Sequence, residues 1–493
     1  MVRMGWALAF WNARKTIFVL RGRRGQCPCH NPSDSGRPLE TGCEAVLQWR
    51  QPQRFRVVCP LLAAKPGGGW VCSVAAGGVR PFWGRALGLA AATVAVAVIL
   101  AAGGVFGTMR AIGYQVSLRQ VIWPPAWREL RAVRAQLFVD QSREHYQAGR
   151  LREAVSALLT AHEVAPNDYR ISMTLAQVAQ AGSPSAADGI YVQMMKQHPE
   201  MHADTARVWF VSLLGRGRLA DVAALARREL SASPAQAEVW TDALIFAARH
   251  LRQPELLESA SAAPGVPAAA AAVLRLEARA RQAPRATVPA MLLAEPVPEN
   301  FPYALTHRAE LLVEFDRPRE ALAVLAQAQR VCSGRDIARL ALTAYVADND
   351  PATLVRETDS LLSPLKNPGL AEITLLSQHL VRFPNKAVLD RVAGLLEGRP
   401  NLLPDNRREA WFSVLCAAGA AGDRPVFARL KGKAVADGLL TPAAADRLAD
   451  FFFGPGTGKR VESILPMAEP MTVYLMYALL DRYWTPEPEK RGG

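Results

Sequence analysis

One uninterrupted apolar segment, residues 86–109, constrains this chain more than any other feature. It contains no charged side chain, and as a helix rising about 1.5 Å per residue it would cover the roughly 30 Å hydrocarbon core of a bilayer. Arg85 and Arg110 flank it, where arginine side chains can reach the membrane surfaces. The segment is too long, and too far from Met1, to be a removed signal peptide. We expect a transmembrane helix, because a buried core helix is usually shorter.

Positive charge is concentrated before this segment. Residues 1–85 hold thirteen Lys and Arg against three acids, a net +10, and the whole chain carries +14, so residues 86–493 carry +4. By the positive-inside rule, the N-terminus is cytoplasmic and residues 110–493 lie outside the cytoplasm. Because the bulk of the chain is close to neutral, we expect no nucleic-acid partner. The predicted location is the inner membrane of a bacterial cell, with a single pass through the lipid bilayer.

The 85 residues before the span form a basic, cysteine-containing segment. Residues 1–20 combine aromatic and apolar residues with Arg14 and Lys15, and two interpretations stay open: an amphipathic helix on the inner leaflet, or a flexible basic arm. Two apolar runs, at 55–62 and 70–74, predict short strands between Gly- and Pro-rich turns.

Five of the seven cysteines lie in this segment. In the cytoplasm they would stay reduced, and thiolates in so small a module favour Zn²⁺ or an iron–sulfur cluster. Their spacing is not that of a zinc ribbon, so reduced structural thiols remain an alternative, as do disulfides if the topology is inverted. The candidate metal ligands are Cys27, Cys29, Cys43, Cys59 and Cys72.

Residues 110–134 form a linker and the start of the next helix. Trp123-Pro124-Pro125 is typical of a helix start, because proline is tolerated in the first turn. Trp123 and Trp127 have two interpretations: packing against a neighbouring helix, which we favour, or contact with the outer membrane interface as an aromatic belt.

From there on, glycine and proline recur with a period of about 33 residues. A glycine that closes one helix is followed 17 residues later by a proline that opens the next, which is typical of stacked helix–turn–helix units that share one core. The pairs are Gly149 and Pro166, Gly182 and Pro199, and Gly217 and Pro234.

The residues within this period resemble the second half of a tetratricopeptide repeat (TPR). The family's order of a small residue, a large apolar residue, a small residue and a closing proline is seen in Glu153-Ala154, Leu158, Ala161 and Pro166, and in part again in Glu320-Ala321, Leu325 and Ala328. The chain departs from the family pattern in Gln141-Ser142, in Ser333 and over residues 250–300. The two repeats with the best match are 135–168 and 302–335.

The resemblance implies a mainly α protein with a right-handed α-solenoid over residues 135–485. It also implies a concave groove that binds proteins or peptides. The composition of residues 486–493 predicts a disordered tail. We therefore expect a membrane-anchored scaffold or adaptor of an envelope assembly, and not an enzyme. The alternative is a membrane sensor or regulator in which the cysteine module binds Zn²⁺ or an iron–sulfur cluster.

Two local patterns imitate catalytic motifs. Residues 451–463 resemble a phosphate-binding loop, but Phe453 replaces its first glycine, Arg460 replaces its Ser or Thr, and a helix rather than a strand is expected before it. His198 and His202 have the spacing of a zinc protease, yet the proline between them would break the helix that such a site needs.

The last apolar stretch, residues 470–484, predicts an aromatic-rich helix. It is about half the length of a membrane span. We expect it to cap the open end of the solenoid.

Overall fold

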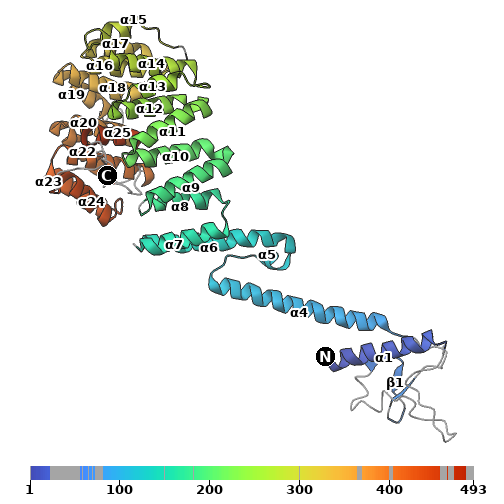
Figure 1. Ribbon diagram of the computed structural model, residues 1–493. Coiled ribbons are helices and arrows are strands. Elements are labelled where there is room, and N and C mark those ends of the chain that lie inside the picture. Colours follow the sequence, from blue (N-terminus) through green and yellow to red (C-terminus); the bar gives the residue numbers. More distant parts are fainter. Residues whose placement is uncertain are drawn as a thin grey trace, which may run out of the picture. The chain divides into compact units, whose positions relative to one another are not determined.

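The computed structural model describes most of the chain (Figure 1). The described residues are 2–22, 56–57, 59–64, 66–68, 70–72, 81–148, 150–180, 182–298, 300–363, 369–398, 404–455, 464 and 471–484. Over these residues the protein is mainly α-helical, as predicted, with 23 α-helices and a single two-stranded sheet. The chain divides into two compact units, the first made of residues 1–149 and 163–165 and the second of 150–162 and 166–493.

The first unit begins with a helix and a small hairpin. Helix α1 (Val2–Leu20) contacts α4 (Trp83–Ile112), and β1 (Leu62–Ala64) pairs antiparallel with β2 (Trp70–Cys72). Of the two interpretations left open for residues 1–20, the structure has the helix, and the strand expected within 70–74 is confirmed. The strand expected over 55–62 is wrong for most of its length, because Arg56 and Val57 are helical and β1 begins only at Leu62.

Helix α4 contains the apolar segment and extends beyond it at both ends. Among the described residues it is the one helix long and apolar enough to cross a membrane, and none of its residues is buried. Its two threonines bond within the helix, Thr93 Oγ1 to the Leu89 carbonyl at 2.8 Å and Thr108 Oγ1 to the Gly104 carbonyl at 2.9 Å. The hydroxyls inside the apolar segment are therefore satisfied within the helix, as a lipid environment requires.

Three further helical segments complete the first unit: α5 (Leu118–Ile122), the 3₁₀ helix η2 (Pro124–Ala126) and α6 (Trp127–Gln147). The helix start predicted at Trp123-Pro124-Pro125 is confirmed, since η2 begins with the two prolines.

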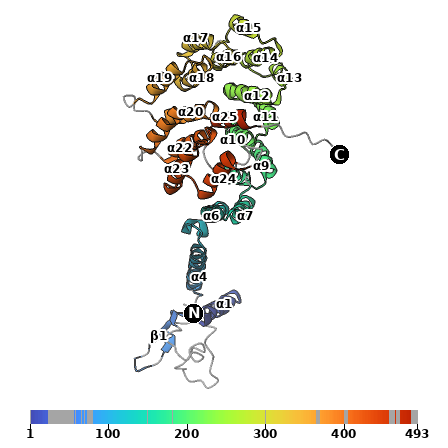
Figure 2. The same cartoon turned by 90° about the vertical axis from the view of Figure 1, so that its left-hand side faces the viewer.

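The second unit is a stack of helices joined by short turns (Figure 1, Figure 2). Even-numbered helices from α12 to α22 each contact the next, and we call them the inner row. Its members are α12 (Ala237–Leu251), α14 (Ala268–Gln282), α16 (Tyr303–Glu314), α18 (Gly334–Ala347), α20 (Leu370–Arg382) and α22 (Pro404–Ala420).

The odd-numbered helices alternate with the inner row along the chain. They are α11 (Leu219–Ala232), α13 (Glu255–Ser261), α15 (Val288–Ala294), α17 (Pro318–Ala328), α19 (Pro351–Leu361), α21 (Lys386–Glu397) and α23 (Arg424–Ala436). Before them come α7 (Leu151–Val164), α8 (Tyr169–Ala179), α9 (Pro184–Gln197) and α10 (His202–Gly215), with 3₁₀ helices η3 (Pro199–Met201) and η4 (Pro234–Gln236). Helices α24 (Pro442–Phe453) and α25 (Val473–Tyr483) follow them.

The glycine and proline period marks real helix boundaries. Its three pairs bracket α7, α9 and α11, as predicted. Gly217 adopts φ +65°, a left-handed conformation that favours glycine, and Pro234 opens η4. Local chemistry at the turns therefore decides where these helices end.

The TPR-like positions are buried. Ala154, Leu158 and Ala161 in α7, and Ala321, Leu325 and Ala328 in α17, are all at most 2% exposed. Small residues at such positions let neighbouring helices approach closely, and α17 contacts both α16 and α18. Across residues 250–300, where the sequence pattern is lost, helix pairs continue with the two short second helices α13 and α15.

Candidate functional site

The C-terminal helix α25 lies among the helices of the second unit rather than at an end of the stack. It contacts α10 and α20, and both views show it beside these helices (Figure 1, Figure 2). The expectation that it caps the open end is therefore wrong. The reason is its composition: apolar side chains point out in all directions, so the helix must be covered on every side.

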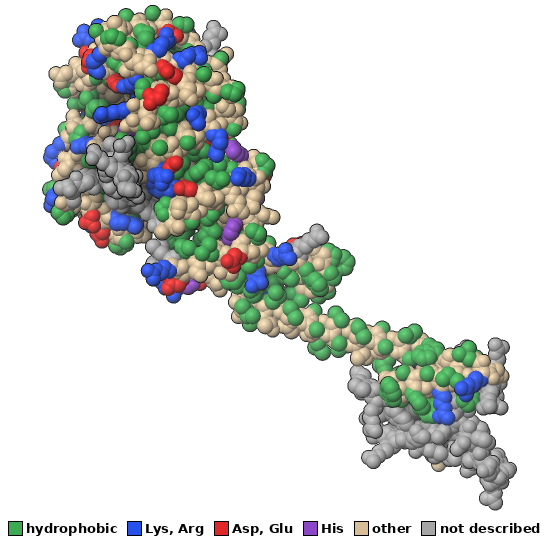
Figure 3. Space-filling model, in the orientation of Figure 1, with side chains coloured by type: hydrophobic (Ala, Val, Ile, Leu, Met, Phe, Trp, Pro, Cys, Tyr) green, Lys and Arg blue, Asp and Glu red, His purple; other side chains and the backbone are tan. Residues whose placement is uncertain are grey.

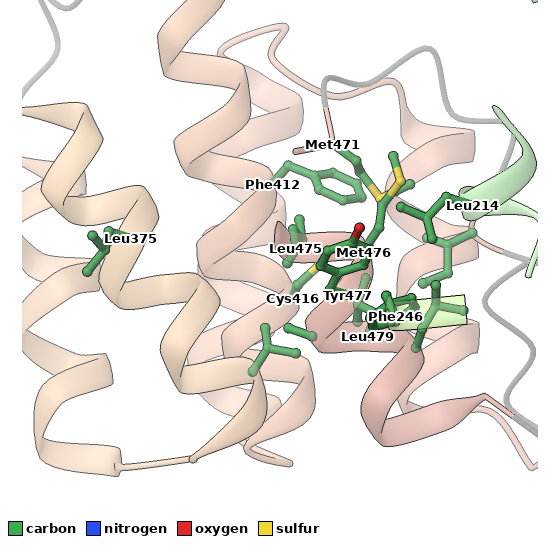
Figure 4. Close-up of a cluster of buried hydrophobic side chains, with 14 of the residues drawn as sticks. Leu214, Phe246, Leu375, Phe412, Cys416, Met471, Leu475, Met476, Tyr477 and Leu479 are labelled. Atoms are coloured by element: carbon green, nitrogen blue, oxygen red, sulfur yellow. The ribbon is translucent and has the colours of Figure 1, made fainter. Parts of the chain in front are cut away.

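An apolar cluster holds α25 in place (Figure 4). Its residues from Leu475 to Leu480 are all buried. The Tyr477 ring stacks on Phe246 of α12, with centroids 3.9 Å apart and planes at 16°. Figure 4 shows Leu475, Met476 and Leu479 in the same cluster as residues of other helices, among them Leu214, Phe412 and Cys416.

Polar contacts fix both ends of α25. At its start, Thr472 caps the helix by accepting from the Leu475 N–H at 3.2 Å, and its Oγ1 accepts a bond of 2.6 Å from Gln378 Nε2. At its end, Asp481 pairs with His250 of α12 at 3.2 Å and with Arg382 of α20. These contacts define one orientation and register for the helix.

Two further bonds come from the aromatic residues that flank the apolar core of α25. The Tyr474 hydroxyl donates to Asp336 Oδ1 of α18 at 3.0 Å, and the Arg339 guanidinium lies 4.6 Å from the Tyr474 ring centroid. Beyond the end of the helix, Trp484 Nε1 donates to the Gly217 carbonyl at 3.3 Å. Charged and polar groups from several helices of the inner row thus contact α25.

The inner row also carries a partly buried network of charges that joins α12, α14 and α16. Arg249 of α12 donates to both carboxylate oxygens of Glu277 at 2.7 and 3.0 Å, and to Glu310 at 2.6 Å. Glu277 is fully buried and also accepts from Arg281 Nε at 2.7 Å. His307 Nε2 lies 3.2 Å from its second oxygen. Two-point contacts of this kind fix side-chain geometry as well as charge.

The network and its burial shift the pKa values of the carboxyl groups in and beside it. Burial alone would raise the pKa of Glu277, but the Arg249 guanidinium and the nearby His307 imidazole hold that pKa well below its usual range. Burial likewise opposes ionisation of Glu310, yet Arg249 and Arg339 lower its pKa to about 2. Asp242 behaves differently, because burial and the nearby Glu310 raise its pKa. Tyr303 donates to Asp242 Oδ1 at 3.0 Å.

The network fixes three helices of the inner row, α12, α14 and α16, relative to one another. Its arginines and carboxylates carry opposite charges and are hydrogen-bonded to one another. The network is therefore rigid, and none of these charged groups is left without a partner of opposite charge. Sequence reasoning did not find it. A signal was available in Tyr303, His307, Glu310 and Glu314, whose spacing places four polar residues on one face of a helix that also needs an apolar face.

The candidate metal ligands remain a prediction. Cys27, Cys29 and Cys43 lie outside the described residues, and for Cys72 only the backbone in β2 is described. Cys59 is buried, and the ammonium of Lys15, itself 2% exposed, lies 3.4 Å from its Sγ. An ammonium at that distance repels a metal cation rather than helping to bind one. Within the described part of the chain, no group of three His, Cys, Asp or Glu is placed to hold a metal.

The structure places the two histidines and the helix of the two patterns that imitate catalytic motifs. His202 bonds to the buried carboxylate of Glu229 at 2.9 Å, while His198 lies at the end of α9, where its ring packs edge-on against Tyr169. The helix expected before the glycine-rich loop is confirmed as α24, and residues 456–463 of that loop lie outside the described residues.

No protein-family model matches the chain, and a search of curated proteins finds no match either. The fold and the site therefore define the class of protein by themselves: a mainly helical protein of stacked helix pairs, with one candidate membrane-spanning helix in the part of the chain that the structure describes.

Proposed function

We propose that this chain is a single-pass membrane protein that acts as a non-catalytic scaffold, binding other proteins through a TPR-like, right-handed α-solenoid outside the cytoplasm. The observation that carries the proposal is α4: a helix of 30 residues, apolar and unburied along its length, in a chain whose second unit is a stack of helix pairs. Stacked helix pairs create extended surfaces for protein recognition.

The membrane part of the proposal rests on what can cover α4. Water does not stabilise so long an exposed apolar surface, whereas the hydrocarbon of a bilayer does. The excess of Lys and Arg before α4 supports a cytoplasmic N-terminus in the inner membrane.

The position of α25 changes where we expect partners to bind. In a solenoid whose inner row is free, a peptide can lie along that row. Here α25 is seated against it, and six consecutive buried residues make its release unfavourable. We therefore place partner proteins on the exposed surface of the stack and assign the inner row to α25.

Crosslinking in living cells tests the scaffold function. The tagged full chain and a control chain that ends at Gln147 are crosslinked, purified in parallel and compared by mass spectrometry. We expect proteins that are retained by the full chain alone. Equal recovery from both chains would contradict the scaffold function.

Topology is tested with a membrane-impermeant maleimide on a variant in which Cys332 and Cys416 are replaced by serine. We expect the N-terminal cysteines other than the buried Cys59 to react only after permeabilisation. Reaction in intact cells would place the solenoid in the cytoplasm instead. Since Cys416 is fully buried and Cys332 only partly, Cys332 is the matched site in the second unit: a chain that keeps it should be labelled before permeabilisation.

A further inference from the structure

The chain turns sharply at the end of α4. Gly113 caps the helix with φ +104°, a conformation that side chains with a Cβ rarely adopt. Its N–H bonds to the Arg110 carbonyl, and the Tyr114 N–H bonds to the Met109 carbonyl. Residues 113–127, which we call the elbow, then lead through α5 and η2 into α6.

The elbow is a folded element with contacts of its own. Val116, Ala126 and Ala135 of α6 are at most 2% exposed. Trp127 Nε1 donates to the Val121 carbonyl at 3.2 Å. A Cβ on Gly113 would meet Leu137 of α6 at 3.4 Å, so α6 passes close to the turn. The elbow therefore holds a defined shape beside the end of α4.

The outer surface of the elbow is apolar. Five large side chains between the last turn of α4 and the first turn of α6 are 53–60% exposed: Ile112, Leu118, Ile122, Trp123 and Trp127. Leu118 and Ile122 are four residues apart and share one face of α5. Figure 3 shows hydrophobic side chains gathered over α4 and over the adjoining elbow. The favoured sequence interpretation, that the two tryptophans pack on a neighbouring helix, does not describe this arrangement.

We propose that the elbow is an interfacial anchor that sits in the headgroup region of the outer leaflet, with Leu118 and Ile122 toward the acyl chains and the two indole rings at headgroup level. Three observations support a phospholipid occupant. The patch is continuous with the exposed apolar surface of α4, tryptophan is enriched at membrane interfaces, and the exposed Arg110 and Arg119 suit anionic headgroups. The inference rests on the proposed membrane span.

Such an anchor would give the scaffold a fixed base. A span that is joined to the next helix by a free linker lets that helix tilt, whereas an elbow held at the interface restricts it. The α6 helix would then leave the membrane at one angle, because Gly113, η2 and the buried contacts of the elbow set that angle.

Site-specific photocrosslinking tests the anchor. The full chain is reconstituted in vesicles of phosphatidylethanolamine and phosphatidylglycerol, with p-benzoylphenylalanine in place of Ile122 or of Trp123. Adducts are identified by mass spectrometry after illumination. The matched control is the same group in place of Val331, which is 57% exposed, as Trp123 is, but lies in the second unit.

We expect lipid adducts at positions 122 and 123 at least fivefold more abundant than at position 331. Lipid adducts no more frequent than in the control would overturn the anchor. Crosslinks to a second copy of the chain in place of lipid would overturn it too, and would assign the patch to a protein interface.

A third site separates this inference from the proposed function. With p-benzoylphenylalanine in place of Ala97, at the middle of α4, lipid adducts must form if α4 spans the bilayer. Lipid adducts at 97 without adducts at 122 and 123 would refute the anchor and leave the span intact. Absence of adducts at 97 would refute the span itself.

Discussion

Helices α4 and α25 are both rich in apolar residues, yet they lie in opposite environments. None of the residues of α4 is buried, and Leu100 is 71% exposed. In α25, six consecutive residues are buried, and Leu479 is fully so. Apolar content alone therefore does not decide what covers a helix.

The polar groups of the two helices show the difference. Thr93 and Thr108 of α4 bond to carbonyls four residues back in the same helix. In contrast, Tyr474 and Asp481 of α25 bond to side chains of α18, α12 and α20. A helix for lipid must satisfy its polar groups alone, whereas a helix for a protein core can depend on partners.

The sharpest test of the comparison is one substitution made in both helices. Leu479→Ala should lower the free energy of unfolding of the helical unit by about 4 kcal/mol, because it removes a fully buried side chain and leaves a cavity. Leu100→Ala should change it by less than about 0.5 kcal/mol, because this side chain is already 71% exposed in the folded protein. Urea unfolding of the detergent-solubilised chain, followed by circular dichroism, measures both. Equal effects would show that α25 is not part of the core.

A second pair of substitutions tests polar side chains in the same way, at Glu277 in the core and at Thr108 in α4. Glu277→Ala should lower the free energy of unfolding by about 3 kcal/mol, since Arg249 and Arg281 lose a buried partner, although each keeps one other carboxylate. Thr108→Val should change it by less than about 0.5 kcal/mol, because the lost bond is local and the helix remains intact. The same unfolding assay applies, and a loss below about 1 kcal/mol for Glu277→Ala would contradict a buried network.

Acid should weaken the core that holds α25 before it affects α4. Burial, with Arg382 and Arg339 beside it, lowers the pKa of His379 from 6.5 to about 4. Between pH 6.5 and 4, His379 is therefore protonated in the unfolded chain but neutral in the folded chain. The free energy of unfolding falls as the pH drops through this range. From pH 7 to pH 5 we expect a loss of about 2 kcal/mol.

The control for this pH effect is His379→Gln, which should remove most of the difference between the two pH values in the same unfolding assay. Glu310 does not interfere, because its lowered pKa confines its contribution to the range between pH 4.5 and about 2. An unchanged pH dependence in the variant would assign the acid sensitivity to other groups.

The smallest expected effect concerns one hydroxyl of α25. Tyr474→Phe removes the bond to Asp336 and should lower the free energy of unfolding by about 1 kcal/mol. Tyr146→Phe, at a tyrosine that is 45% exposed on α6, should have no measurable effect. A destabilisation of the Tyr474 variant that matches the control would mean that Asp336 does not select the register of α25.

Much of the fold could be predicted because the signals are local. An uncharged apolar run predicted α4, and the Gly217 and Pro234 pair predicted the ends of α11, since turn conformations depend on the residues at the turn. Buried Ala154 and Ala321 agree with the need for small residues at helix contacts. These properties follow from a few neighbouring residues each.

The candidate site could not be predicted in the same way. Tyr477 stacks on Phe246, and Trp484 bonds to Gly217 across 267 positions of the chain. Glu277, Arg249 and Glu310 come from three helices. The sequence around each of these residues does not indicate which distant residue it contacts. A charged residue on a helix is more often solvated than buried, so no buried pair would be expected.

By itself the sequence determined the length and apolar character of α4, the charge asymmetry around it and the boundaries of many helices, because each of these depends on chain length, side-chain type and local backbone preference. Only the tertiary structure decided that α25 lies against the inner row, that arginines and carboxylates of α12, α14 and α16 pair around the buried Glu277, and that the elbow is apolar on its outer side. Those facts depend on which helices meet, and that is settled by packing over the whole chain.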